Sequence, residues 1–282
     1  MQILPIIGLF IVTLIWGGGF VASDLALNSL TPFQIMFIRF MIASLLMGVS
    51  NYKQFKHYSK KQIYAGIILG ISLFLGFALQ IVGLQFTTPS KNAFLTALNV
   101  VIVPFIAYML LKKPLKSNHL IGALCSIIGV GLLSLEDFNI GFGDLLTILC
   151  AIAFAFQIFL TGVFVKKYDE QSLNFMQMFI SALLSLVCMI LFQETSFQLQ
   201  TSGIISVLYL GMISTTFCYF LQTKCQKYVD ETRTAIILSM ESVFGTLFSM
   251  LILKEQLTIK MILGCFIILS GVLISNIEKV KK

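Results

Sequence analysis

The stretch Ala93-Phe94-Leu95-Thr96-Ala97, followed by Lys113-Pro114-Leu115, decides the fold because a similar stretch recurs later in the chain. The second copy begins with Ala235-Ile236-Ile237-Leu238-Ser239 and continues with Glu255-Gln256-Leu257, 142 residues further on. This spacing is about half of the 282 residues. The chain is therefore predicted to contain one unit twice, and we place the two units at residues 1–138 and 139–282.

Composition indicates an integral membrane protein. Hydrophobic residues make up 58% of the chain and charged residues 11%, whereas soluble proteins are about one quarter charged. Apolar runs near the roughly 20 residues that span a lipid bilayer as a helix recur along the chain. Ten spans are predicted, at residues 3–23, 32–50, 63–85, 92–111, 118–135, 144–165, 172–192, 203–222, 233–252 and 258–276.

Ten spans divide into five for each unit, and five is an odd number. The second unit must then lie upside down relative to the first. The sequence predicts an all-α integral membrane protein with ten transmembrane helices in two inverted five-helix repeats. In many secondary transporters this arrangement places the substrate site near the midplane, between the repeats.

The positions of lysine and arginine predict the orientation. With the N-terminus in the cytoplasm, fifteen of the 19 basic residues fall in cytoplasmic loops, and Lys91, Lys254 and Lys260 fall outside. This bias follows the positive-inside rule, so both termini are predicted to be cytoplasmic. The net charge of +7 is scattered over small loops, which argues against a nucleic-acid surface.

Two charged residues lie inside predicted spans. Arg39 falls in the second span and Glu241 in the ninth. A central charge costs about 2.5–3.5 kcal/mol on insertion scales, so such groups usually face a cavity or a partner. Either Glu241 is a substrate-amine or proton site with Arg39 as counter-ion or carboxylate site, or the two form a structural salt bridge. Sequence leaves both alternatives open.

The repeat spacing relates Glu241 to a neutral amide. Subtracting 142 from its number gives Asn99. We therefore expect a cavity lined asymmetrically, with one titratable group contributed by the second repeat. This arrangement is compatible with proton coupling through Glu241.

The run Trp16-Gly17-Gly18-Gly19 in the first span holds the single tryptophan of the chain. Trp16 lies too deep for the interfacial aromatic belt, so we expect it in a cavity wall or in the core. The glycines would let a substrate or another backbone approach. Phe156 is predicted to lie opposite Trp16 in the second repeat, beside Gln157.

Further polar and structural residues lie at membrane depth. Each polar side chain, taken singly, is typical of contacts between helices, and Gln157 is the first choice among them as a ligand. Pro104 is predicted to kink the fourth span and free backbone carbonyls. Glycine pairs at 122/129 and 264/271 favour packing within the chain over a dimer interface. The other polar candidates are Gln80, Gln177, Tyr209, Gln222 and Ser242.

Motifs of other protein classes are missing from the sequence. It has no GxxxxGK[ST] stretch for a nucleotide, and no HExxH or GxSxG for an intramembrane enzyme. The six cysteines form no CxxC or Cys/His cluster, so neither a disulfide framework nor a metal site is expected. His57 and His119 are interpreted as solvated residues in or beside cytoplasmic loops.

Several short segments together resemble the EamA-type families of the drug/metabolite transporter superfamily. They are Leu14-Ile15-Trp16-Gly17, Phe33 to Phe40, Gly83 to Leu98, Val103-Pro104, Met240 to Phe244, Lys254 to Leu257, Gly264 and Gly271. The resemblance covers essentially the whole chain. Two departures exist: Phe156 replaces a tryptophan often found in the sixth span, and Lys112-Lys113-Pro114 replaces the acidic residue usual after the fourth.

The resemblance implies a secondary transporter that exports small metabolites, with amino acids as the best-attested group. Similar proteins bind the substrate in a central cavity between the repeats and alternate access by rocking helices. It implies no cofactor, and a bacterial inner or plasma membrane as the location, with a monomer or homodimer as the assembly. A facilitative channel, a multidrug exporter, a membrane scaffold and, remotely, an intramembrane enzyme are the alternatives.

Overall fold

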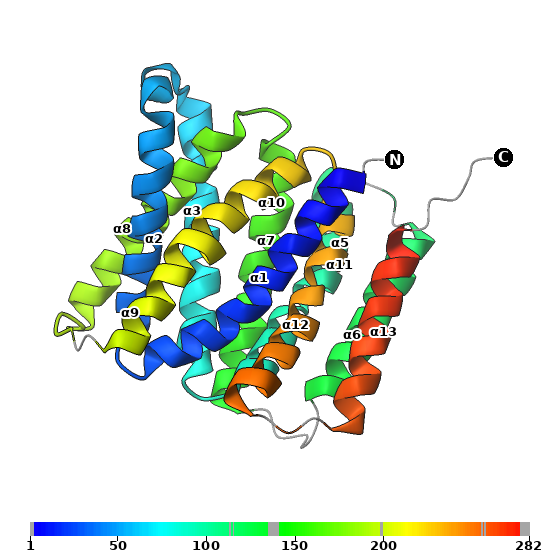
Figure 1. The fold of residues 1–282 in the computed structure, drawn as a ribbon. Helices are drawn as coiled ribbons and strands as arrows, with labels where there is room; N and C mark the ends of the chain where they lie inside the picture. The colour runs from blue at the N-terminus through cyan, green and yellow to red at the C-terminus, as the bar shows by residue number, and fades with distance from the viewer. Residues whose placement is uncertain are drawn as a thin grey trace.

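A computed structural model of the chain describes residues 3–112, 114, 116–134, 141–197, 200–254, 256 and 258–276. Within these ranges the regular structure is helical, with no strand (Figure 1). The helices of the first half are α1 Ile3–Leu27, α2 Pro32–Asn51, the 3₁₀ helix η1 Tyr52–His57, α3 Lys60–Leu84, α4 Pro89–Thr96, α5 Asn99–Leu111 and α6 Ser117–Ser134. Those of the second half are α7 Phe142–Phe164, α8 Glu170–Leu191, α9 Thr201–Leu208, the π-helix η2 Tyr209–Phe217, α10 Cys218–Gln226, α11 Glu231–Leu238, α12 Met240–Phe248, the π-helix η3 Ser249–Leu253 and α13 Ile259–Asn276.

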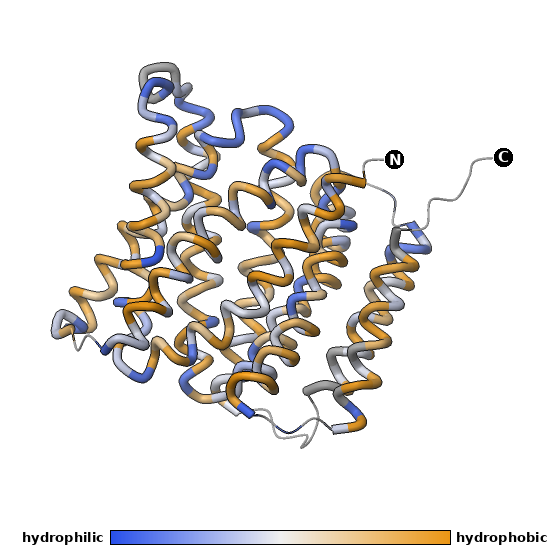
Figure 2. Tube along the Cα trace, in the orientation of Figure 1, coloured by the Kyte–Doolittle hydropathy of each residue, from blue (hydrophilic) through white to orange (hydrophobic). Residues whose placement is uncertain are grey.

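The pattern of polar residues along the bundle fits a membrane protein. Polar segments gather at the two ends of the helices, and apolar residues dominate between them (Figure 2). Within the described part of the chain, eight helices or continuous helix pairs are long and apolar enough to cross a bilayer. α6 and α13 contain shorter apolar stretches, Ser117–Gly129 and Ile262–Ile274. The sequence-predicted count of ten spans stays a prediction.

Helix bounds repeat along the chain at a constant spacing. α4, α5 and α6 begin 142 residues before α11, α12 and α13 respectively. α5 ends before Lys112 and η3 ends before Lys254, and both residues adopt left-handed backbone conformations with φ of 51° and 58°. The sequence stretch that suggested the doubling therefore corresponds to a repeated local structure. Lys113, Leu115, Glu255 and Leu257, as well as the 138/139 boundary, lie outside the described residues.

The first two helices of each half repeat at a slightly shorter spacing. α2 and α8 begin at Pro32 and Glu170, 138 residues apart, directly after the N-cap residues Thr31 and Asp169. Asp169 accepts a hydrogen bond from the backbone N–H of Ser172 at 2.9 Å, which satisfies a free donor of the first turn. The spacing of 138 therefore relates α1 and α2 to α7 and α8.

Glycines set the closest helix contacts. A Cβ atom on Gly129 would lie 2.6 Å from the carbonyl oxygen of Gly264, and one on Gly271 would lie 2.7 Å from that of Gly122. These residues join α6 to α13, which lie side by side at the edge of the bundle (Figure 1). The predicted packing within the chain is confirmed, and these glycines are not free to form a dimer interface.

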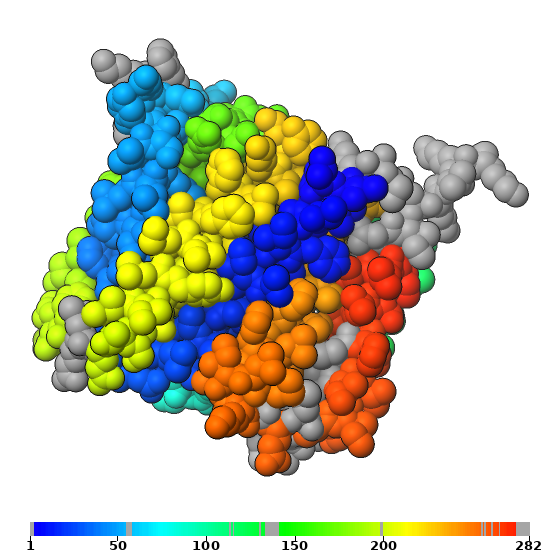
Figure 3. Space-filling view, viewed as in Figure 1, coloured from blue at the N-terminus to red at the C-terminus, as the bar shows by residue number. Residues whose placement is uncertain are grey.

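The buried apolar residues form two large clusters, and Trp16 of α1 packs against both. On one face of the molecule α1 fills the space between α9–α10 and α12 (Figure 3). We call the end of the bundle with the loops after α1 and α3 the α1–α2 end. The opposite end, with the loops after α7 and α10, is the α7–α8 end.

Candidate functional site

A break in one helix of each half prepares the site. α4 ends at Thr96 and α5 begins at Asn99, and the same interruption separates α11 from α12 at Ser239. The sequence prediction placed the disturbance of the fourth span at Pro104. That position is wrong, since α5 continues through Pro104 and the second break occurs where the repeat has no proline. A broken helix inside a membrane is tolerated where it lines a cavity.

The breaks border a central cavity that both halves line. It extends from the middle of the helices toward the α1–α2 end, where Ser23, Leu84 and Asn92 contribute to its wall. Five aromatic rings line it, those of Trp16, Phe20, Phe77, Phe154 and Tyr219. The other lining residues are Gly19, Arg39, Gln80, Ile81, Thr96, Asn99, Gln157, Ile158, Leu210, Ser214, Leu238 and Glu241.

Arg39 lies in the cavity wall with little solvent contact. Its Nε atom donates a hydrogen bond to Oγ1 of Thr215 at 3.0 Å. Its guanidinium carbon lies 4.0 Å from the centroid of the Phe77 ring, a cation–π geometry. These contacts hold the cation at the cavity surface and leave guanidinium N–H groups available to an anionic ligand, because arginine has five donors.

Glu241 contributes the opposite charge to the same cavity. It belongs to the first turn of α12, directly after the break at Ser239, and is buried. Among the described residues no ion pair joins Arg39 to Glu241, although both side chains line the cavity. A structural salt bridge between them is therefore absent from this conformation.

A wall of amide and hydroxyl groups lies on the first-half side of the cavity. The amide of Gln80 donates to Oγ1 of Thr96 at 3.1 Å, and the amide of Asn92 donates to the backbone oxygen of Gln80 and to Oγ1 of Thr147. Oδ1 of Asn99 is buried without a hydrogen-bond partner. Since an unsatisfied buried acceptor is costly, Asn99 is suited to receive a hydrogen bond from a ligand or water.

Comparison with known proteins assigns the family. Residues 3–135 and 141–277 each match the EamA-like transporter family. The chain belongs to the EamA-like transporter family. The resemblance stated from the sequence is thereby confirmed.

Several relatives of this EamA-like transporter cover nearly its full length. An uncharacterized transporter of Archaeoglobus fulgidus is 34% identical over 273 residues, which make up 96% of this chain and 85% of the relative. The uncharacterized transporter YoaV of Bacillus subtilis is 24% identical over 279 residues, 96% of each chain. A solved crystal structure superposes with a TM-score of 0.80, covering 98% of this chain and 97% of that one, at 18% identity. At that identity the likeness shows the fold alone.

The WGGG run of this EamA-like transporter combines cavity and packing roles. Nε1 of Trp16 donates to the backbone oxygen of Ser214 at 2.8 Å, while its ring lies 5.1 Å from that of Tyr219. A Cβ atom on Gly17 would lie 2.5 Å from Cβ of Phe244. Trp16 therefore lines the cavity as expected, and Gly17 permits the close contact of α1 with α12.

Two predicted cavity residues lie elsewhere. Phe156 is 41% exposed and does not line the cavity, because the spacing of 138 between α1 and α7 pairs Trp16 with Phe154. Tyr209 donates its hydroxyl to the backbone oxygen of Ile15 at 2.8 Å and so joins η2 to α1 without lining the cavity. The predicted positions of Trp16, Arg39, Gln80, Asn99, Gln157 and Glu241 all lie along the cavity.

Sequence reasoning missed other lining residues of this EamA-like transporter. Phe77 and Tyr219 carry no sequence signal of their own, because each is one aromatic residue in an apolar helix. Asn92 and Thr96 carried a usable signal: they precede Asn99 by seven and three residues, the spacing of one helix face. Phe154 was accessible through the spacing of 138, had the helix starts been known.

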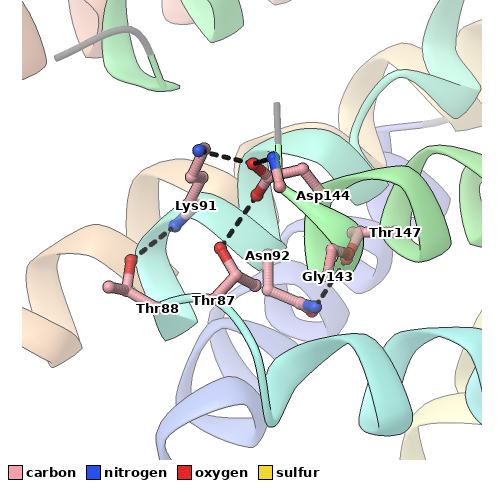
Figure 4. Close-up of polar contacts among 8 residues, drawn as sticks. Thr87, Thr88, Lys91, Asn92, Gly143, Asp144 and Thr147 are labelled. Carbon is pink, nitrogen blue, oxygen red and sulfur yellow. Dashed lines mark hydrogen bonds and ion pairs between the residues drawn. The ribbon is translucent and has the colours of Figure 1, made fainter. Parts of the chain in front are cut away.

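A polar cluster closes the contact between α4 and α7 at the α1–α2 end (Figure 4). Nζ of Lys91 lies 2.6 Å from Oδ2 of Asp144, whose other oxygen accepts from the Thr87 hydroxyl at 3.0 Å. Oδ2 of Asp144 also accepts from the backbone N–H of Gly141, at the start of α7. The carboxylate thus caps α7 and joins it to α4.

A second ion pair joins α7 to α11 at the α7–α8 end. Nζ of Lys166 lies 2.8 Å from Oε1 of Glu231, whose side chain is almost fully buried. His119 also lies inside the protein, 5% exposed, so its interpretation as a solvated residue is wrong. The cause is the packing of the first turns of α6 beneath neighbouring helices. The side chain of His57 lies outside the described residues.

Proposed function

We propose that this protein is a secondary active transporter that exports small metabolites, namely amino acids or related compounds, through the central cavity. The proposal includes ten transmembrane helices in two inverted repeats, residues 1–138 and 139–282. The repeated helix bounds and the two family matches support the doubling. The odd number of predicted crossings in each repeat supports the inversion.

The observation that carries the substrate class is the placement of Arg39 and Glu241. Both line one cavity, and Arg39 is engaged by Thr215 and Phe77 rather than by Glu241. A zwitterion offers a carboxylate to the guanidinium and an ammonium group to Glu241. The aromatic rings of the wall, among them Trp16, suit an apolar side chain. An amino acid with an apolar side chain fits all three features.

The proposed mechanism is alternating access. The cavity would face one side of the membrane at a time, because rigid rocking of one repeat against the other opens and closes its ends. The positive-inside bias favours the α7–α8 end as cytoplasmic, with both termini on that side of the cell membrane. The cavity extends toward the other end, as an outward-facing carrier would have it. Export would be coupled to proton entry through Glu241.

The test is efflux from proteoliposomes. Vesicles containing the purified protein are loaded with a pooled radiolabelled amino-acid mixture, and efflux is compared with that from protein-free vesicles. Arg39→Ala, shown to be folded by gel filtration and thermal unfolding, is the matched control. We expect efflux only with the wild-type protein, and splitting the pool then names the substrate. No efflux from a folded preparation would contradict the amino-acid assignment while leaving family membership intact.

A pH gradient separates the coupled exporter from a facilitative channel. With the membrane potential clamped, acid outside should accelerate efflux through a proton-coupled carrier. An unchanged rate would favour facilitated diffusion. The same vesicles loaded with a lipophilic cation test the multidrug alternative, which the aromatic lining of the cavity favours.

A further inference from the structure

A second set of polar residues is buried between the cavity and the α7–α8 end. We call it the inner polar set: Thr161, Gln177, Gln222, Gln226 and Thr234. Each of these side chains has an exposed fraction of 0%. Thr161 and Gln226 lie near the ends of α7 and α10, and Thr234 lies in the first turn of α11. They therefore lie beyond the end of the present cavity, on its closed side.

The inner polar set is connected to the cavity by hydrogen bonds. Gln157, which lines the cavity, donates through Nε2 to Oγ1 of Thr161 at 3.1 Å and to Oε1 of Gln177 at 3.2 Å. Gln177 in turn donates to Oδ1 of Asn174 at 2.6 Å, which also accepts from the hydroxyl of Thr223. A polar path thus continues from the cavity wall toward the α7–α8 end.

Several atoms of this set have no partner. Both side-chain atoms of Gln222, Oε1 of Gln226 and Oγ1 of Thr234 are buried without a hydrogen bond. In a membrane protein such groups cost several kcal/mol each. Contacts between helices would have satisfied them if helix packing were their role. Their unused capacity indicates that they bond to water or a ligand in another conformation.

The repeat spacings relate the inner polar set to the wall of the open cavity. Subtracting 142 from Gln222, Gln226 and Thr234 gives Gln80, Leu84 and Asn92. Subtracting 138 from Thr161 and Gln177 gives Ser23 and Arg39. All five first-half positions line the cavity, listed here as Ser23, Arg39, Gln80, Leu84 and Asn92.

We propose that the inner polar set forms the cytoplasmic half of the translocation path, closed in this conformation. This inference rests on the proposed transport function and inverted arrangement. When the α7–α8 end opens, these residues take the place that the cavity wall holds now, and they donate to and accept from water and the polar groups of the substrate. The inner half then has no counterpart of the Arg39 cation, because Gln177 occupies that position. A substrate carboxylate would bind more weakly there, which favours its release.

The closed side is held by contacts of α7. Lys166 and Glu231 form the ion pair between α7 and α11, and Nε2 of Gln226 donates to the backbone oxygen of Ile158 at 3.0 Å. Opening this end requires both contacts to break. Glu231→Gln weakens the ion pair without changing the side-chain volume, and it should therefore raise the population of the open form.

Cysteine accessibility tests the proposal without a substrate. In a variant whose six native cysteines are replaced, Gln222→Cys is treated with a membrane-impermeant cationic methanethiosulfonate reagent from either face of oriented vesicles. Gln80→Cys, at the repeat-related position, reports the open cavity. Ala65→Cys, buried in an apolar cluster near the start of α3, is the control for a buried site off the path.

We expect Gln222→Cys to react from the cytoplasmic face at least tenfold faster than Ala65→Cys, and faster again with Glu231→Gln. Gln80→Cys should react from the outside. If Gln222→Cys is as unreactive as Ala65→Cys in both backgrounds while Gln80→Cys reacts, the proposal is overturned. Reaction of Gln222→Cys from the outside would overturn it as well. A failure of amino-acid efflux leaves this labelling pattern unaffected, so the two proposals fail separately.

Discussion

Arg39 and Phe77 form a cation–π pair, with the guanidinium carbon 4.0 Å from the ring centroid. The pair fixes a positive charge in the cavity wall without neutralising it. A carboxylate in place of Phe77 would have satisfied Arg39 and removed it from ligand binding. An aromatic face stabilises the cation by about 2 kcal/mol when it is desolvated and leaves its edge N–H groups free to donate.

The first prediction concerns Phe77. Phe77→Leu removes the aromatic face beneath Arg39, and we expect an approximately tenfold higher KM for the transported substrate, equivalent to about 1.4 kcal/mol. Phe74→Leu on the same helix is the matched control, since Phe74 is buried in the same apolar cluster and does not line the cavity. Both variants should lower the thermal midpoint through lost packing. Equal KM values for the two would contradict a positioning role of Phe77.

The second prediction concerns Glu241 and its repeat-related residue. Glu241→Gln keeps the shape of the side chain and removes its charge, so the response of efflux to an imposed pH gradient should disappear. Asn99→Ala, at the corresponding position of the first half, should retain the gradient response even if the rate falls. The measurement is the ratio of efflux rates with and without the gradient. A ratio in Glu241→Gln equal to that of the wild type would exclude this carboxyl from proton coupling.

Sequence alone located much of the fold and part of the site. The repeated stretch from Ala93 onward predicted the doubled helices because packing between α4–α5 and α11–α12 requires similar residues at similar places. Arg39 and Glu241 were accessible for a physical reason: a charge inside an apolar span needs an explanation. Trp16 was accessible through its depth in the first span.

The rest of the site depends on local backbone geometry that composition does not reveal. The π-helix Tyr209–Phe217 determines which of its residues face the cavity, and it gives Ser214 the position at which its carbonyl accepts from Trp16. Phe156 was misplaced because the two halves have two spacings, 138 and 142. A single spacing could not describe both helix pairs.

The third prediction concerns the ion pair between α4 and α7. Asp144→Asn leaves Lys91 without its carboxylate and weakens the cap of α7, whose acceptor the carboxylate supplies. Removing one partner of a buried pair costs about 3–5 kcal/mol. Because the Lys91 side chain is 27% exposed, we expect the lower part of this range. The readout is the thermal midpoint of unfolding in detergent.

The control for Asp144 is an exposed pair of the same charges. Glu170 lies 3.2 Å from Nζ of Lys227, and the two side chains are 22% and 44% exposed. Glu170→Gln should change the midpoint little, since exposed pairs contribute about 0–1 kcal/mol. High salt should reduce this small contribution further. A larger effect for Glu170→Gln than for Asp144→Asn would contradict the structural role assigned to the buried pair.

The fourth prediction separates packing from cavity roles in the WGGG run. In Gly17→Ala the new Cβ would lie 2.8 Å from the backbone nitrogen of Gly245, so α1 and α12 must move apart. Such overpacking costs about 1–3 kcal/mol, which exceeds the gain of up to about 1 kcal/mol from the higher helix propensity of alanine. Gly17→Ala should therefore lower the thermal midpoint and the yield of monodisperse protein.

Gly19→Ala provides the comparison, because its Cβ would meet first the Oγ of Ser214 at 3.1 Å, and a hydroxyl can rotate away. This variant should keep the wild-type midpoint or raise it slightly, while its methyl group enters the cavity and slows efflux. The two substitutions add the same atom two residues apart, so opposite effects on stability and transport would show which glycine serves which role. If Gly19→Ala unfolds as readily as Gly17→Ala and both retain transport once folded, the whole run serves helix packing, and Gly19 has no part in shaping the cavity.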